Sequence, residues 1–453
     1  MEFAQENHSL SENLTVWQRF TALLALAAPV MLEQLGQILL GTVDTYFAGQ
    51  LGDDAIAAIN AANLFSNLYT SVFVSLGLGV IIMVGHALGA GDHVLANRVM
   101  RQTILFSSGI CVLLGTASVL LRHPLLYAVG ARGDILSMGS EYYAIVCGPC
   151  ILSCLTIVLS YGLKAAQNTK ASMRAAIAAN VLNAVLDAVF IKLGMGVFGL
   201  GLATTLARLL NVLLLLRLYF KGVTVLRLDK TLWEKDFSLI KELISYSLPI
   251  MLTQFSTRLV ILVHGSMVLY LGSTYYVANS ITLAIDEYAC IPSAGYEAAA
   301  ATMVSQSLGA GKPRSAVAYT RLSCVGNVVF MTLIGAFLAV FALPLAGIFT
   351  ETAEICNMVR QILVFMVFFD WTSSLSHVFT SAVQATGDAK YPLYVTIGCD
   401  IVMRLGVGCL LAFVLGWNLM GIWVGIVLDF LGRTILLSRR FRSRFREPAP
   451  TIE

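Results

Sequence analysis

Long apolar stretches, each about as long as a bilayer is thick, follow one another along almost the whole chain. The hydrocarbon core of a bilayer is roughly 30 Å thick, and about 20 helical residues cross it. Lipid cannot hydrogen-bond to exposed backbone groups, so such stretches form helices with internal hydrogen bonds. Of the 453 residues, 58% are hydrophobic and only 12% are charged. The chain is therefore predicted to be an all-α polytopic membrane protein.

Twelve of these stretches are predicted to cross the membrane as helices. An even number of spans places both termini on the same side. The approximate bounds of the spans are 20–47, 55–86, 102–121, 141–162, 172–191, 197–219, 243–270, 278–307, 322–342, 360–384, 391–415 and 418–437.

The lysines and arginines between the spans indicate which side is cytoplasmic, because cytoplasmic loops carry an excess of them. With the N-terminus inside, most of the 29 fall in cytoplasmic segments, whereas the outer loops hold Arg122, Arg132 and Lys192. Residues 1–16 are polar and acidic, unlike a secretory signal, which begins with a basic stretch. We therefore expect a multi-pass protein of the plasma (inner) membrane with both termini in the cytoplasm.

The two halves of the chain are related by an internal repeat. When the sequence is shifted by 220 residues, PVMLEQ at 29–34 falls on PIMLTQ at 249–254. By the same shift, LGAG at 88–91 falls on LGAG at 308–311. Six spans in each half give both repeats the same topology, as in transporters whose repeats are related by an axis along the membrane normal. The spans are therefore predicted to form two pseudo-symmetric six-helix bundles.

The repeat predicts a chain with two lobes. Pro29 and Pro249 begin the matching motifs, inside the first span of each lobe, and are predicted to kink their helices. The predicted parts are a cytoplasmic N-terminal segment (1–16), an N-lobe of six spans (17–220), a cytoplasmic linker (221–242), a C-lobe of six spans (243–437) and a basic cytoplasmic tail (438–453).

These features together resemble the multidrug and toxic compound extrusion (MATE) family. The resemblance rests on P-x-x-L-x-Q in the first span of each half, DTYFAGQLG at 44–52, the two LGAG motifs and NVLNAVLDAVF at 180–190. It implies a secondary antiporter, not an enzyme, that exports organic, drug-like and mainly cationic compounds by alternating access in exchange for H⁺ or Na⁺. It implies no cofactor beyond that coupling ion. The expected partners are small-molecule substrates and the lipid bilayer, with no nucleic acid, and a monomer is expected.

Asp44, near the outer end of the first span, is a candidate functional residue because a charge inside a bilayer costs roughly 2.5–3.5 kcal/mol or more. A solvated helix end at the outer membrane surface is the alternative. Asn180, Asn183 and Asp187 in the fifth span share one helical face. Since both spans run outward, Asp187 is expected at a depth similar to that of Asp44, which favours a shared site.

The resemblance implies that Asp44, Asn183 and Asp187 gather in an N-lobe cavity and bind the coupling cation. Asn180 and Thr205, the latter in the sixth span, are further candidates. Two neighbouring carboxylates favour the binding of a proton, or of Na⁺ with help from amide oxygens. No metal site is predicted beyond a Na⁺ ion at these three residues.

Further polar side chains are candidates for a substrate cavity. Glu33 shares a helical face with Asp44, but a packing role is an equal alternative. Asp286, Glu287 and Glu297 in the eighth span would attract cations or play a structural role. For the two intramembrane histidines, His264 and His377, a hydrogen-bonded packing role is the favoured alternative. The candidates are Glu33, Gln34, His264, Glu287, Glu297, Asp370 and His377.

The C-lobe does not repeat the acidic pair, because the internal shifts place His264 opposite Asp44 and Arg404 opposite Asp187. Asp400 and Arg404 have the i, i+4 spacing of a helical ion pair, and Asp429 and Arg433 have the same spacing. Both pairs are predicted to be structural. Thr257 stands where some members of the family carry a sodium-binding glutamate, which favours H⁺ over Na⁺ as the coupling ion.

Other classes fit less well. A flippase of lipid-linked saccharides from the same superfamily is the nearest alternative, but such proteins usually have more spans and a basic cavity. GAGD at 89–92 resembles a motif of intramembrane aspartyl proteases, but its repeat at 309–312 reads GAGK. GAGKP at 309–313 lacks the spacing of a nucleotide-binding P-loop.

Overall fold

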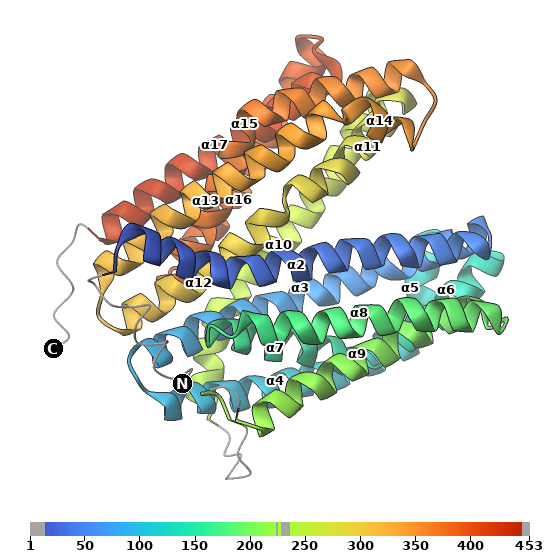
Figure 1. Ribbon diagram of the computed structural model, residues 1–453. Coiled ribbons are helices and arrows are strands. Elements are labelled where there is room, and N and C mark those ends of the chain that lie inside the picture. The colour runs from blue at the N-terminus through green and yellow to red at the C-terminus, as the bar shows by residue number, and fades with distance from the viewer. Residues whose placement is uncertain (1–13, 223–224, 228–235, 446–453) are drawn as a thin grey trace. The chain divides into compact units, whose positions relative to one another are not determined.

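The computed structural model describes residues 14–222, 225–227 and 236–445, which Figure 1 shows as a helical chain. The described residues form helices and no strands. Most of the predicted segment 1–16, part of the predicted linker 221–242 and the end of the predicted tail 438–453 lie outside the described residues.

Most of the helices follow one another with short connections, and residues 221–236 separate the helices of the two halves. Those of the first half are α2 (Val16–Gln50), α3 (Asp53–Gly89), α4 (His93–Leu120), α5 (Arg122–Ala128), α6 (Gly133–Cys147), α7 (Cys150–Ala165), α8 (Thr169–Lys192) and α9 (Gly196–Phe220). Those of the second half are α10 (Phe237–Leu271), α11 (Ser273–Ala289), α12 (Ile291–Gly309), α13 (Pro313–Val340), α14 (Ala342–Gly347), α15 (Ala353–Ala385), α16 (Lys390–Cys399), the π-helical segments η1 (Asp400–Val407) and η2 (Leu410–Val414), and α17 (Asn418–Arg444).

Ten of the described helical stretches are long and apolar enough to cross a membrane, and α6 with α7, bent by 44° at their junction, raises the number to eleven. The predicted eighth span is divided into α11, with 17 residues, and α12, with 19 residues. Pro292 lies in the first turn of α12 and has no backbone N–H, which is why a helix begins there. The all-helical, multi-span prediction is confirmed, whereas twelve spans in two six-helix bundles remain a prediction.

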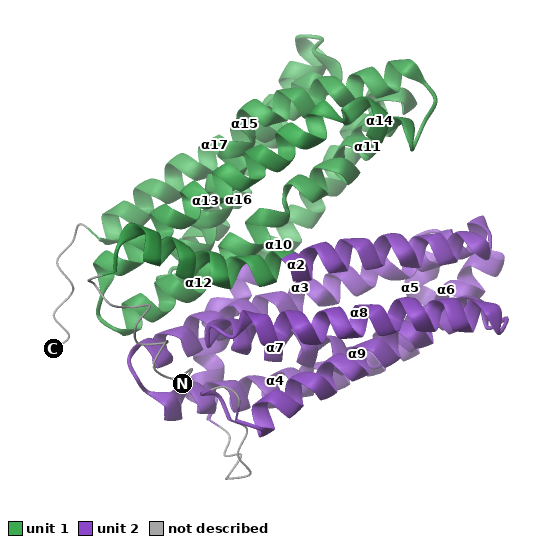
Figure 2. Cartoon of the chain, viewed as in Figure 1, with its two compact units in different colours: residues 1–31, 252–453 green, residues 32–251 purple. Residues whose placement is uncertain are grey.

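The chain forms two compact units, shown in different colours in Figure 2. Unit 1 holds the residues up to Met31 and those from Leu252 onward, and unit 2 holds Leu32–Met251. Both boundaries fall inside helices, so α2 and α10 each belong partly to one unit and partly to the other. The lobes predicted from the sequence, 17–220 and 243–437, assigned each of these helices to a single lobe.

The two helices change unit at equivalent places. Pro29 lies inside α2 and Pro249 inside α10, and each helix continues through its proline. The unit boundaries follow Met31 and Met251, two residues after the prolines and 220 residues apart. The sequence repeat is therefore matched in the structure, because the first helix of each half is divided between the two units at the same position of the repeat.

Glycines on neighbouring helices allow α2 to pack closely within unit 1 and α10 to pack closely within unit 2. In unit 1, a Cβ atom at Gly295 of α12 would lie only 2.7 Å from the carbonyl oxygen of Ala27 in α2. In unit 2, a Cβ atom at Gly79 of α3 would lie 2.5 Å from Ser247 Oγ in α10. Helices in lipid associate through such close packing, because lipid gives no hydrophobic drive for helix association.

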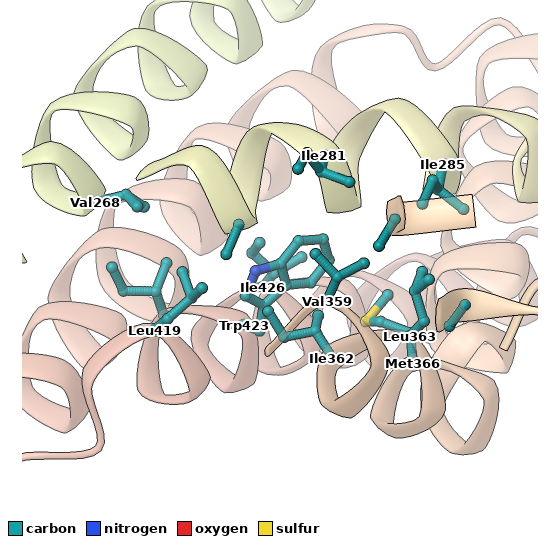
Figure 3. Close-up of a cluster of buried hydrophobic side chains, with 14 of the residues drawn as sticks. Val268, Ile281, Ile285, Val359, Ile362, Leu363, Met366, Leu419, Trp423 and Ile426 are labelled. Atoms are coloured by element: carbon teal, nitrogen blue, oxygen red, sulfur yellow. The ribbon is translucent and has the colours of Figure 1, made fainter. Parts of the chain in front are cut away.

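Each unit has its own apolar core. The core of unit 1 in Figure 3 packs Ile281 of α11 and Val359 of α15 around Trp423 of α17. The Trp423 indole is 1% exposed, and its Nε1 donates a 3.2 Å hydrogen bond to Asn279 Oδ1. In unit 2, Tyr143 of α6 is fully buried within a separate cluster.

The turn between α15 and α16 is fixed to the end of α17. Asp388 Oδ2 accepts hydrogen bonds from Arg440 Nη2 at 2.7 Å and from Arg444 Nη2 at 3.3 Å. Burial by itself raises the pKa of the Asp388 carboxyl, but the hydrogen bonds from Arg440 and from the Tyr391 backbone N–H outweigh it, and the pKa lies below its usual value. This contribution to stability is present above the unfolded-state pKa and is lost as the pH falls through the folded-state value.

The substitution Gly295→Ala should destabilise unit 1, because the added methyl group would collide with the Ala27 carbonyl in the backbone of α2. Overpacking of this kind costs about 1–3 kcal/mol. Thermal unfolding of the purified protein in detergent measures the effect. The control is Gly265→Ala in α10, where the added Cβ meets no atom within 4 Å. Equal unfolding midpoints for the two variants would contradict this account of the packing.

Candidate functional site

A pair of carboxyl groups lies in unit 2, where α2 meets α8. Asp187 of α8 is 1% exposed, Asp44 of α2 is partly buried, and the two side chains interact directly. Asn183 Nδ2 donates a 2.8 Å hydrogen bond to Asp187 Oδ2. The Oδ1 atoms of Asp44 and Asp187 are buried and have no hydrogen-bond partner. Because adjacent carboxylates repel one another, the pair is suited to hold a proton or a small cation.

The two other residues predicted to take part in cation coupling are Asn180 and Thr205, and their polar atoms have different surroundings. Asn180 lies one turn before Asn183, and its buried Nδ2 has no hydrogen-bond partner. Thr205 Oγ1 donates to the backbone carbonyls of Ile145 and Gly201, each at 3.0 Å, so its proton is directed to the backbone of α6 and α9. The structure therefore brings Asp44, Asn183 and Asp187 together and directs the Thr205 hydroxyl elsewhere.

Two residues near the pair were not predicted from the sequence. Arg208 of α9 interacts electrostatically with Asp44, and its Nη1 donates a 3.2 Å hydrogen bond to the Val146 carbonyl oxygen. Tyr142 of α6 is 6% exposed and also lies within electrostatic reach of Asp44. An arginine inside the sixth span was the available signal, since an intramembrane charge requires a partner.

Glu33 is part of a buried ion pair in the same unit. Its Oε1 lies 3.1 Å from Lys164 Nζ of α7, and its Oε2 accepts a 3.3 Å hydrogen bond from Ser172 Oγ of α8. Glu33 is 8% exposed and Lys164 is 5% exposed. Lys164 lies in the last turn of α7. Gln34, the next residue in α2, is partly buried.

A second group of ionisable residues lies in unit 1. His377 Nδ1 of α15 is 2.6 Å from Glu297 Oε1 of α12, and both side chains are partly exposed. Asp370 lies on the same helical face as His377. It is 1% exposed, and its Oδ1 has no hydrogen-bond partner. Asp286 of α11 interacts electrostatically with both Asp370 and His377. Glu287 is exposed. Four of the predicted acids and histidines of the C-lobe therefore form one cluster.

His264 does not share the contacts of that cluster. It is 6% exposed and interacts with Asn279 of α11 and with Arg404 of η1. Asn279 also accepts the hydrogen bond from Trp423. The position that the internal repeat pairs with Asp44 therefore belongs to a polar network of different composition.

Two aspartates and two arginines of that network form a closed set of ion pairs. Arg433 Nη2 lies 2.7 Å from Asp400 Oδ1, and Arg433 Nε lies 2.7 Å from Asp429 Oδ1. Arg404 Nε lies 3.3 Å from Asp429 Oδ2, and its i, i+4 contact with Asp400 is longer, at 3.8 Å. Both predicted ion pairs are confirmed, but the cross-pairs between η1 and α17 were not predicted. The charges compensate each other, which is consistent with a structural role.

Replacing Arg433 by Met should destabilise the protein strongly, because Asp400 and Asp429 would share one remaining arginine while buried. Breaking a buried ion pair costs about 3–5 kcal/mol. Chemical or thermal unfolding in detergent measures the loss. The matched control is Arg439→Met, which removes an exposed arginine from the same helix. A similar loss in both variants would show that the four-residue network is not the source of the stability.

A family model described as MatE matches residues 29–189 and, separately, residues 249–410. The two matches begin at Pro29 and Pro249, which confirms the internal repeat. Together they cover more than half of the chain.

Several curated proteins are similar over most of their length. A Thermotoga maritima protein named "Probable multidrug resistance protein NorM" is 24% identical over 419 residues, which cover 91% of this chain and 90% of that protein. The Bacillus subtilis "Uncharacterized transporter YisQ" is 23% identical over 436 residues, covering 93% and 94%. "Protein DETOXIFICATION 39" of Arabidopsis thaliana is 26% identical over 426 residues, covering 92% and 82%.

Solved structures share the fold. An outward-facing multidrug resistance MATE transporter superposes with a TM-score of 0.90 at 21% identity, over 94% of this chain and 96% of that chain. A mutant of the Vibrio cholerae MATE transporter VcmN superposes with a TM-score of 0.89 at 19% identity, over 96% and 98%. At these identities the likeness concerns the arrangement of the helices.

Proposed function

Because the chain belongs to the MATE family of transporters, we propose that it is a secondary antiporter that exports organic, drug-like and mainly cationic compounds in exchange for H⁺ or Na⁺. It does so by alternating access of its twelve spans, six in each half, in the plasma membrane with both termini cytoplasmic. The observation that carries the proposal is the Asp44–Asp187 pair, whose Oδ1 atoms are buried without a hydrogen-bond partner.

The chemistry of this pair supports cation coupling. A buried carboxylate must be compensated by a positive charge or by protonation. Arg208 supplies one positive charge near Asp44, whereas Asn183, which donates a hydrogen bond to Asp187, carries no charge to compensate the second carboxylate. A proton or a Na⁺ ion at Asp44 and Asp187 would remove the repulsion between them. Binding of the ion on one side of the membrane and its release on the other would then couple its inward flow to export.

We propose H⁺ as the coupling ion in preference to Na⁺. Thr257 replaces the glutamate with which some members of the family bind sodium in the second half. A proton needs only the carboxyl oxygens of Asp44 and Asp187, whereas hard metal cations prefer several oxygen ligands.

The acidic cluster of unit 1 supports a cationic substrate. Glu297, Asp286 and Asp370 place three carboxyl groups together with one histidine, and Glu297 is partly exposed. Such a cluster attracts organic cations and disfavours anionic lipid-linked saccharides. The names of the relatives, which include multidrug resistance proteins, support the export of drug-like compounds. The flippase alternative therefore has less support.

The substitution Asp44→Asn should reduce dye export driven by a proton gradient to the level of protein-free liposomes, because the carboxyl that would bind the coupling ion is removed. Export of a fluorescent cationic dye from proteoliposomes, under separate proton and sodium gradients, measures this. Asp53→Asn, which alters an exposed acid at the start of α3, is the control and should transport normally. Parent-like transport by Asp44→Asn in both gradients would refute the coupling role.

The substitution Glu297→Gln should weaken cationic substrates selectively. Loss of one charged contact of roughly 1.5–3 kcal/mol corresponds to a KM about ten- to a hundredfold higher for cations. The KM for a neutral substrate should change little. Glu354→Gln, an exposed acid at the start of α15, is the control. Equal effects of Glu297→Gln on cationic and neutral compounds would reject a substrate role for this residue.

A further inference from the structure

α2 and α8 meet at three levels within unit 2. Ser172 Oγ of α8 donates to Glu33 Oε2 of α2. Next, a Cβ atom at Gly36 of α2 would lie 3.2 Å from Asn180 Nδ2 of α8. Finally, Asp44 meets Asp187.

The last two contacts are separated by nearly the same rise along α2 and along α8. Asp44 follows Gly36 by eight residues and Asp187 follows Asn180 by seven, which correspond to rises of about 12 and 10.5 Å. The two helices therefore run side by side in the same direction from the Gly36 contact to the carboxyl pair. A small slip of α2 along α8 would separate Asp44 from Asp187.

About one helical turn before Gly36, Glu33 of α2 forms an ion pair with Lys164 of α7. Both residues are more than nine-tenths buried, and 3.1 Å separates Glu33 Oε1 from Lys164 Nζ. Lys164 Nζ also lies 4.8 Å from the centre of the Tyr161 ring. The Tyr161 ring is seated against Gly77 of α3, where a Cβ would lie 2.7 Å from its Cγ. Lys164 is thus held by the packing of α7 on α3, and it presents a fixed charge to α2.

The position of Glu33 along α2 gives this ion pair its importance. The unit boundary falls between Met31 and Leu32, so Glu33 is the second residue of α2 that belongs to unit 2. Residues of α2 before the boundary, such as Leu23 and Ala27, pack in a core of unit 1. Just beyond the place where α2 changes unit, a buried ion pair attaches it to α7, and Ser172 attaches it to α8.

We propose that Glu33 and Lys164 are positioning residues for coupled transport. Their ion pair fixes the register of α2 on α8 and so holds Asp44 against Asp187. This inference rests on the proposed function for its effect on transport, but its structural part stands independently. It assigns Glu33 to the scaffold of the coupling site and not to a substrate cavity.

The structural part is tested by a disulfide that reports the register. In a cysteine-free background, Gly36→Cys and Asn180→Cys place two thiols where a Cβ atom of α2 would lie 3.2 Å from a side chain of α8. The register is then perturbed by Glu33→Gln combined with Lys164→Met, which removes both charges and leaves neither buried alone. The initial rate of disulfide formation should fall in the doubly neutral variant. It should recover when the charges are exchanged, as Glu33→Lys with Lys164→Glu. Thermal unfolding of each variant confirms that it is folded.

The transport part uses the native cysteines and the same charge variants. A misplacement of about 1 Å at a reacting group can cost roughly 100-fold in rate, so the doubly neutral variant should lose dye export by up to that factor. The loss should appear in the maximal rate with an unchanged KM, because Glu33 does not contact substrate in this proposal. The exchanged pair should recover transport. Lys170→Met, an exposed lysine at the start of α8, is the matched control and should behave as the parent.

The outcomes separate the alternatives. Slower disulfide formation with a lower maximal rate, both recovered by the exchanged pair, supports the proposal. An unchanged rate of disulfide formation overturns it. A raised KM for cations at an unchanged maximal rate also overturns it and places Glu33 in the substrate cavity. If the parent protein transports no dye in any gradient, the proposed function fails, and the disulfide measurement still decides whether the ion pair sets the register.

Discussion

The cost of placing charge out of water governs how this protein arranges its polar residues. A buried charge is tolerated only where an opposite charge or a bound proton or ion compensates it. Asp400, Arg404, Asp429 and Arg433 satisfy this requirement among themselves, and Glu33 and Lys164 satisfy it as a pair. The Asp44–Asp187 pair does not, because Arg208 adds one positive charge, near Asp44, to a pair of two carboxyl groups, and Oδ1 of each carboxyl lacks a hydrogen-bond partner. The contrast singles out this pair among the buried charges of unit 2.

The internal repeat sharpens this contrast, since it places different chemistry on equivalent positions. Asp44 corresponds to His264, Asn183 to Asp400 and Asp187 to Arg404. In unit 2 these positions hold two acids and an amide, whereas in unit 1 they join a network whose aspartates and arginines are equal in number. At these equivalent positions the repeat therefore carries an uncompensated acidic centre in unit 2 and a compensated centre in unit 1. Coupling lodged in one half follows more naturally from this arrangement than coupling duplicated in both.

The sequence revealed what lies along a helix but not what lies across from it. Hydropathy predicted the apolar spans, and periodicity placed Asn183 with Asp187 and Asp429 with Arg433 on common faces. Neither signal reports which helices are neighbours, so the Glu33–Lys164, Arg208–Asp44 and Arg433–Asp400 contacts could not be predicted. Lys164 shows the limit clearly, because a lysine at the end of an apolar stretch looks like a loop charge until its partner is known. The change of unit within α2 was hidden for the same reason, since hydropathy is blind to which neighbours a helix packs against.

The shared helices give the asymmetry of the two halves a physical basis. α2 and α10 change unit at equivalent positions, but within the part of the chain that the structure describes the ion pair that directly follows the change lies on α2. The internal shifts place Thr253 opposite Glu33 and Ser381 opposite Lys164, so the second half has neutral hydroxyl groups where the first has opposite charges. Hydroxyl groups hydrogen-bond more weakly than a buried ion pair and leave the position of a helix less strictly defined. A helix that carries an ion-binding carboxylate three turns further on needs a defined register, whereas a helix that carries His264 within a closed polar network does not depend on one to the same degree. The charged anchor thus occurs on the helix whose register matters for the acidic pair.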